Sequence, residues 1–260
     1  MSDQIIGLYD WLQSPAGRYL LAWEHAQVDQ AVADIFGYHA LQLGLPALDG
    51  LRANRMPHQW LATEQCLPST GDTAEPPMRR VALLTDFTAL PFPSSSLDLV
   101  LMPHTLELSA DPHATLREVE RVLVPEGRAV ICGLNPLSLW GLRRQRSRWC
   151  HKLGWGDVYM PDSGEAIGYW RLRDWLRLLG MEVELGQFGC YRPAVESEKW
   201  LQRFDWMDRA GARWWSIAGA AYFLVAVKRV RGMRLMGPAW KAVPVRAGKS
   251  VSIANRNKEI

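Results

Sequence analysis

Two polar side chains, Asp86 and His104, each follow an apolar run directly within the stretch TDFTALPFPSSSLDLVLMPHTLEL. The runs RVALLTD and LDLVLMP are apolar without clean alternation, which is typical of strands buried on both faces. If both strands belong to one parallel sheet, their carboxyl ends deliver a carboxylate and an imidazole to the same ligand-binding crevice. A carboxylate accepts hydrogen bonds and a histidine titrates near neutral pH, so this pair could hold a polar ligand and orient it or move a proton.

Strands alternate with helices along the chain, and these elements must position the polar pair. One predicted helix opens with a capping serine and a proline (residues 14–37), and another opens with Asp-Pro (residues 111–123). A third helix is predicted over residues 169–180. Strands are predicted over residues 39–45, 58–65, 80–86, 97–103, 129–134, 181–188 and 220–230. This order predicts an α/β fold with a mostly parallel sheet covered on both faces.

The length and charge pattern favour one large domain with appendages. The chain has 260 residues, of which 48% are hydrophobic, enough for a packed core. We predict an N-terminal helical cap over residues 1–38, a main domain over 39–230, and a basic, disordered tail over 231–260. The tail carries seven of the basic residues and one acid, whereas the whole chain has a net charge of +3.

Cysteine usage and apolar runs predict a cytoplasmic protein. The four cysteines, Cys66, Cys132, Cys150 and Cys190, are scattered without metal-ligand spacing, so we expect reduced thiols and no bound metal. The longest apolar run, AGAAYFLVAV, is shorter than the roughly 18 residues of a membrane span. The N-terminal residues lack the basic start and apolar stretch of a signal peptide.

Three stretches together carry a resemblance to a known family: TDFTALPFPSSSLDLVLMPHTLEL, DPHATLREVERVLVPEGRAVI and NPLSLWG. They resemble the class I S-adenosylmethionine-dependent methyltransferases, a group that includes the ubiquinone-pathway C-methyltransferases. The likeness is close over residues 81–141 and looser over 39–230. It implies a Rossmann-like, seven-stranded, mostly parallel sheet whose last strand, over residues 220–230, is antiparallel. It also implies S-adenosylmethionine as cofactor.

The resemblance assigns roles to three residues. Asp86 would accept a hydrogen bond from the adenine amino group, Phe87 would lie against the purine ring, and Glu64 would bind the ribose hydroxyls. His104 is the candidate catalytic base or orienting group. Other interpretations stay open: Asp86 as a turn residue, Glu64 as an exposed loop acid, and His104 as a packed side chain.

The glycine-rich first motif of the family is altered here. In LQLGLPALDG, Gln42 replaces the acid and Gly44 keeps the first glycine, but Pro46 and Leu48 occupy the places of the other two. Gln42 and Gly44 remain candidate cofactor contacts. Two hypotheses follow: a methyltransferase with an altered cofactor loop, or a catalytically inactive methyltransferase-like domain that binds a protein or nucleic acid.

The residues do not identify the methyl acceptor, but one tryptophan-rich segment is compatible with a small apolar molecule. Trp206, Trp214 and Trp215 lie where the family inserts substrate-covering elements, and they would line an apolar pocket, ordinary core or a protein contact. The cluster RRQRSRWCHK (143–152) and the basic tail are interpreted as solvated faces, with a nucleic-acid surface as the alternative.

Overall fold

The structure is a computed structural model that describes residue 8 and residues 11–64, 80–152, 166–195 and 197–229. Its strands form one seven-stranded sheet in the order β3-β2-β1-β4-β5-β7-β6. The strands are β1 (His39–Leu43), β2 (His58–Thr63), β3 (Leu83–Leu84), β4 (Leu97–Pro103), β5 (Leu123–Leu134), β6 (Met181–Gly189) and β7 (Ala221–Lys228). Only β7 runs antiparallel to its neighbours, β5 and β6. The predicted mixed sheet with an antiparallel last strand is confirmed.

The helices begin where the capping signals predict. The Ser14 hydroxyl accepts a hydrogen bond from the Gly17 N–H at 3.1 Å, and the Asp111 carboxylate accepts one from the Ala114 N–H at 3.0 Å. The helices are α2 (Pro15–Ala33), α3 (Thr105–Leu108), α4 (Pro112–Val122), α5 (Leu139–Lys152), α6 (Tyr169–Leu178), α7 (Glu198–Arg203) and α8 (Trp206–Trp214), with a 3₁₀ turn η1 (Ser216–Ala218).

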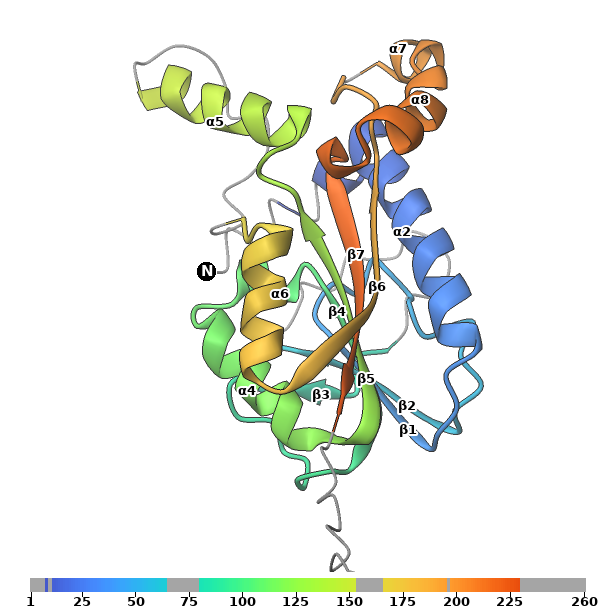
Figure 1. Ribbon diagram of the computed structural model, residues 1–260, viewed down its shortest axis with the longest axis vertical. Coiled ribbons are helices and arrows are strands. Elements are labelled where there is room, and N and C mark those ends of the chain that lie inside the picture. The colour runs from blue at the N-terminus through green and yellow to red at the C-terminus, as the bar shows by residue number, and fades with distance from the viewer. Residues whose placement is uncertain (1–7, 9–10, 65–79, 153–165, 196, 230–260) are drawn as a thin grey trace, which may run out of the picture. The chain divides into compact units, whose positions relative to one another are not determined.

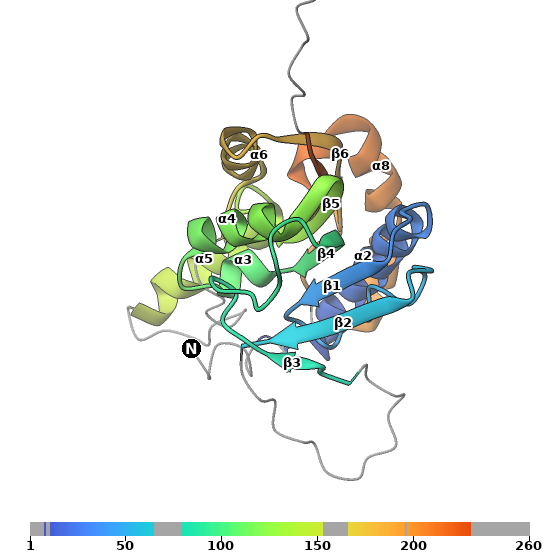
Figure 2. The same ribbon diagram turned by 90° about the horizontal axis from the view of Figure 1, so that it is seen from below.

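Two apolar cores lie on opposite faces of the sheet. Helix α2 covers one face, and α4 and α6 cover the other (Figures 1 and 2). Along β4, Leu99 and Leu101 belong to the core under α2, whereas Val100 and Met102 belong to the core under α4 and α6. This alternation follows from the two-residue repeat of a strand and explains why β4 is apolar throughout.

Three elements differ from the prediction. Strand β3 spans two residues where seven were expected. The strand predicted over residues 129–134 begins earlier, because the preceding stretch VPEGR is also part of β5, with a register shift opposite Leu97 and a positive φ of 65° at Glu126. The basic cluster 143–152 belongs to helix α5, which the sequence pattern did not indicate because its apolar residues are interrupted by arginines.

Some predictions fall on residues outside the described ranges. The tail over residues 231–260 and Cys66 are among them. The predicted division into a cap, a main domain and a tail therefore stays a prediction. Among the described helices, none is long and apolar enough to cross a membrane.

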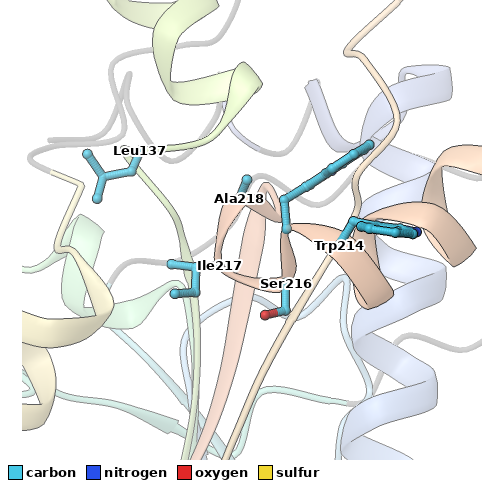
Figure 3. A pocket seen from close by; sticks show the side chains of 6 residues that line it. Leu137, Trp214, Ser216, Ile217 and Ala218 are labelled. Carbon is cyan, nitrogen blue, oxygen red and sulfur yellow. The ribbon is translucent and has the colours of Figure 1, made fainter.

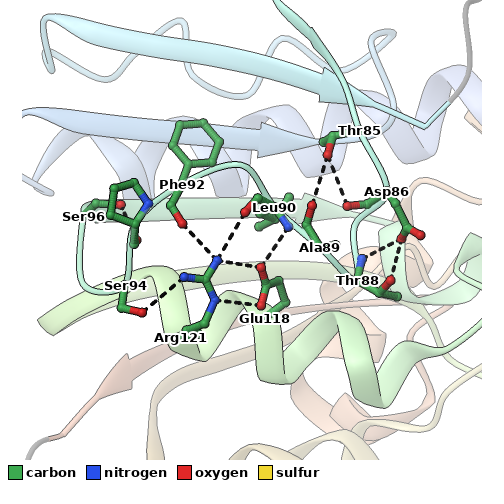
Figure 4. Close-up of polar contacts among 11 residues, drawn as sticks. Thr85, Asp86, Thr88, Ala89, Leu90, Phe92, Ser94, Ser96, Glu118 and Arg121 are labelled. Atoms are coloured by element: carbon green, nitrogen blue, oxygen red, sulfur yellow. Dashed lines mark hydrogen bonds and ion pairs between the residues drawn. The ribbon is translucent and has the colours of Figure 1, made fainter.

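The loop over residues 85–96, which carries Asp86 and Phe87, is fastened to α4 by one ion pair (Figure 4). The Arg121 guanidinium donates to the carbonyl oxygens of Leu90 and Phe92 at 3.2 and 2.9 Å. It also pairs with Glu118, whose other contact is a hydrogen bond from the Leu90 N–H at 2.8 Å. The loop backbone thereby acquires partners that a surface loop would otherwise find in water.

Replacing Arg121 with Met should loosen this loop. The Arg121 side chain is 37% exposed, so we expect a modest loss of about 1 kcal/mol in the free energy of unfolding. Hydrogen exchange at the Leu90 amide should accelerate more than at β4 amides. Arg117→Met, an exposed change on the same helix, is the control; equal effects of the two substitutions would contradict the bracing role.

Candidate active site

The carboxyl ends of β1, β2, β3 and β4 meet at one edge of the sheet, because these strands run parallel. The residues that follow them are Gly44, Glu64, Thr85 and His104. Backbone hydrogen bonds continue the pairing past the strand ends, from the Gly44 N–H to the Ala62 carbonyl at 2.8 Å and from the Thr85 N–H to the Thr63 carbonyl at 3.0 Å. The predicted cofactor residues are therefore neighbours.

Glu64 and Asp86 form a pair of adjacent carboxylates. Glu64 is partly buried, and its carboxylate accepts a long hydrogen bond of 3.4 Å from the Phe87 N–H. Burial raises the pKa of Glu64 above its ordinary value; the negative charge of Asp86 adds to this rise, whereas the Phe87 N–H opposes it. A half-buried acid beside a second acid is a strong hydrogen-bond acceptor for ligand hydroxyl or amino groups.

Asp86 lies at the surface in the turn geometry that was the alternative interpretation. Its Oδ1 accepts hydrogen bonds from the Thr88 N–H at 2.8 Å and the Thr88 hydroxyl at 2.7 Å (Figure 4). These bonds lower the pKa of Asp86, so the side chain is ionised at neutral pH. The turn role fixes the carboxylate without removing it from solvent.

Phe87 is 4% exposed and belongs to the core under α4 and α6. A β-carbon built on Gly44 would lie 3.8 Å from the Phe87 ring and 3.5 Å from the Thr105 hydroxyl oxygen. Gly44 itself has a φ of +73°, a conformation that favours glycine. The ring and the glycine turn thus lie side by side at the end of β1.

Gln42 is buried, and its side-chain amide forms hydrogen bonds with the loop that follows β1. Its nitrogen donates to the Leu45 and Leu48 carbonyls at 3.1 and 2.6 Å, and its oxygen accepts from the Gly50 N–H at 3.1 Å. The sequence could not indicate this role, because it depends on how the loop folds back. We name residues 44–50 the β1 loop.

Leucine side chains make the β1 loop part of the core. Leu45, Leu48 and the following Leu51 are all buried in the cluster under α2, and Leu45 has a positive φ of 34°. A β-carbon on Gly50 would approach the end of the Leu101 side chain to 2.2 Å, so glycine lets the loop lie close to this residue of β4. The loop is filled by its own chain where the family pattern has further glycines.

Replacing Gln42 with Glu, the residue type nearer to the family pattern, should destabilise the fold. A carboxylate would face the loop carbonyls without a proton to donate, at a cost of about 3 kcal/mol in unfolding free energy. Urea unfolding measures this loss. Gln202→Glu, an exposed change of the same chemistry, should be nearly neutral. An unchanged Gln42→Glu protein would show that the amide bonds are dispensable.

His104 was predicted to face an open crevice, but the residue is buried, with 1% of its surface exposed. Its Nε2 lies 2.8 Å from a Glu24 carboxylate oxygen of α2, and its Nδ1 lies 3.1 Å from the Glu107 carboxylate of α3. The other Glu107 oxygen accepts from the Leu134 N–H at the end of β5. We name Glu24, His104 and Glu107 the buried triad.

Burial alone would lower the pKa of His104, but the charges of Glu24 and Glu107 and their hydrogen bonds outweigh it and raise the pKa well above the ordinary value. The imidazole is therefore a buried cation that is shared by two acids. Sequence reasoning missed Glu24, although its spacing between Leu20 and Val28 marks the buried face of α2.

His104→Asn should cost about 3–5 kcal/mol of unfolding free energy near neutral pH, because it leaves buried acids without a cation. A raised pKa means that the stabilisation is complete below the unfolded value of about 6.5 and is lost as pH rises through the folded value. Unfolding free energies of wild type and variant between about pH 6 and pH 10 should therefore converge at the alkaline end. The exposed His113→Asn is the control; a difference independent of pH would refute the ion pairing.

An apolar pocket of about 380 Å³ lies between the segment after β5 and the α8–η1 segment (Figure 3). Its lining residues are Leu137, Trp214, Trp215, Ser216, Ile217 and Ala218. Asn135 joins the two walls, because its amide nitrogen donates to the Ile217 and Gly219 carbonyls at 2.8 and 2.9 Å. A pocket lining was one of three interpretations of Trp206, Trp214 and Trp215, and Trp214 and Trp215 line this pocket.

The sheet order, with parallel β1–β5 and antiparallel β7, is that of the Rossmann-like methyltransferase fold. Residues 59–131 match the family described as "Methyltransferase domain". The chain therefore contains a methyltransferase domain over these residues, and that family implies S-adenosylmethionine as the methyl donor.

Three similar proteins illustrate the range of likeness. An uncharacterized protein, YafS of Escherichia coli K12, is 31% identical over 180 residues, which are 66% of this chain and 65% of YafS. A chain from the Haloferax volcanii complex of the Trm112 methyltransferase activator and a methyltransferase has 20% identity and a TM-score of 0.52, covering 80% of this chain and 90% of that one. An S-adenosylmethionine-dependent methyltransferase from Archaeoglobus fulgidus has 16% identity and a TM-score of 0.51, covering 80% and 94%.

Proposed function

We propose that this protein transfers a methyl group from S-adenosylmethionine to an apolar acceptor bound in the pocket between Leu137 and Ile217. The observation that carries the proposal is the adjacent acid pair, Glu64 and Asp86, at the carboxyl edge of the sheet. The pocket lies beside the end of β5, on the same edge, so donor and acceptor sites would be neighbours.

The residues fit the adenosine half of the cofactor. Glu64 supplies an acceptor for the ribose hydroxyls, Asp86 supplies one for the adenine amino group, and Phe87 lies beside the Gly44 turn. The methionine half has weaker support, since the Gln42 amide is already bonded within the β1 loop. When bound, S-adenosylmethionine supplies an electrophilic methyl group, so the protein's main task is to align the acceptor.

His104 acts in this proposal as a positioning residue. Its ring is enclosed by Glu24 and Glu107, and it fixes the end of β4 relative to α2 and β5. Methyl transfer from a sulfonium needs little general acid or base assistance, so a buried cation at this place is compatible with the chemistry.

The second candidate is a catalytically inactive domain that keeps the fold for binding a partner. The filled β1 loop favours it, because Leu45 and Leu48 are buried where the family pattern has room for the cofactor's methionine. The binding of adenosine-bearing ligands is one measurable property that distinguishes the two candidates.

Calorimetric titration with S-adenosylmethionine and S-adenosylhomocysteine should show binding, with adenosine itself retaining much of the affinity. Asp86→Ala should weaken each ligand about tenfold through the loss of one charged hydrogen bond. The exposed Asp174→Ala on α6 is the matched control. If no adenosine-bearing ligand binds at millimolar concentration, the inactive domain is the better account.

The affinity should also depend on pH through Glu64. The ionised carboxylate is the acceptor, and its pKa lies above the ordinary 4.5, so affinity should begin to fall on acidification at a higher pH than for an exposed acid. Calorimetry of wild type and Glu64→Gln across this pH range isolates the contribution of Glu64. The variant should bind the ligand more weakly, and its affinity should depend less on pH. Identical profiles would remove Glu64 from the site.

A further inference from the structure

Helix α5 presents an apolar row to solvent. Leu139, Leu142 and Trp149 are 53%, 57% and 69% exposed, and their spacing, completed by Arg146, follows one side of a helix. Arg143 lies next to this row and is also exposed. We name Leu139, Leu142, Arg143, Arg146 and Trp149 the α5 face. Large apolar side chains grouped in this way mark an interaction surface.

The opposite side of α5 is anchored, so the exposed row has a fixed direction. Trp140 is 2% exposed, donates its indole N–H to the Arg192 carbonyl at 2.7 Å, and meets the Trp11 ring edge-on at 5.8 Å. Gly141 permits the close approach to Pro136, where a β-carbon would lie 2.2 Å from the carbonyl oxygen. From this first turn the helix projects away from the sheet (Figures 1 and 2).

The charge around the α5 face indicates what kind of partner binds to it. Residues 127–156 contain six Lys and Arg residues and no Asp or Glu, so the helix and its flanks are uniformly basic. Leucine side chains enter the acyl boundary of a bilayer, tryptophan lies at the headgroup level, and arginine pairs with lipid phosphates. We propose that the α5 face docks on the surface of a membrane that contains anionic lipids.

A second surface with exposed tryptophan and arginine side chains lies on the other side of the apolar pocket. Trp214, Trp215 and Ile217 are 76%, 45% and 49% exposed, and Arg209 and Arg213 of α8 are exposed as well. Leu137, which is 71% exposed and precedes α5, lines the pocket opposite Ile217. Docking through α5 would bring the pocket close to the bilayer. If the proposed methyl transfer holds, the acceptor is then an apolar molecule dissolved in the membrane.

Co-sedimentation of the full chain with vesicles tests the docking. Binding should be strong to vesicles of phosphatidylcholine with phosphatidylglycerol, weak to phosphatidylcholine alone, and reduced by salt. The double variant Leu142→Ser/Trp149→Ser and the double variant Arg143→Gln/Arg146→Gln should each lower the binding about tenfold. Failure of wild type to bind anionic vesicles would overturn the proposal.

The control is the double variant Arg177→Gln/Leu178→Ser, which removes one exposed arginine and one leucine that is 86% exposed at the end of α6. All variants keep the basic tail, so a selective loss assigns the binding to α5. Equal binding by the α5 variants and the control would refute the assignment. If wild type does not bind vesicles but binds a duplex RNA, and the α5 variants lose that RNA binding, the α5 face is a nucleic-acid surface. No cofactor is present in these assays, so their failure leaves the methyl-transfer proposal untouched.

Discussion

The buried triad is the constraint on which the carboxyl edge of the sheet depends. One imidazolium, His104, pairs with two carboxylates that come from α2 and α3, and Glu107 also holds the backbone at the end of β5. Buried charges are tolerated only when they are paired, so these elements are fixed relative to one another. The Gly44 turn reaches the same edge through Thr105, which follows His104 and donates to the Leu43 carbonyl at 2.6 Å. The candidate cofactor and acceptor sites are built on either side of this arrangement.

Much of the fold was predictable because its signals are local. The caps at Ser14 and Asp111 and the continuous apolar run of β4 each report their own structure, and together they specify alternating strands and helices. Helix α5 escaped prediction because its stability comes from contacts of Trp140 with distant residues and not from an apolar period. The bulged start of β5 escaped because glycine and proline indicate a turn unless a neighbouring strand pairs with them.

The candidate site also contains features that local sequence signals indicate and features that depend on distant contacts. The order of parallel strands brings together the strand ends that carry Glu64 and Asp86, so the proximity of these two residues follows from the strand order. The environment of His104 was not predictable from its own neighbourhood, since its partner Glu24 lies on a helix eighty residues earlier in the chain. Gln42 looked like a weakened cofactor contact, whereas its actual partners are carbonyl groups that only the folded loop brings within reach.

The leucine-filled β1 loop belongs to the folding core, and in the proposed function it would also lie against the cofactor. A substitution there alters the fraction of molecules that are folded, and in a cell a loss of one or two kcal/mol changes protein abundance several-fold. A selection in living cells for an altered methyl donor measures the amount of product formed. Such a selection would therefore reject loop variants because little folded protein accumulates, whatever their donor specificity. The first step toward changing the donor in such a protein is to add stability elsewhere in the domain, which gives the loop freedom to vary.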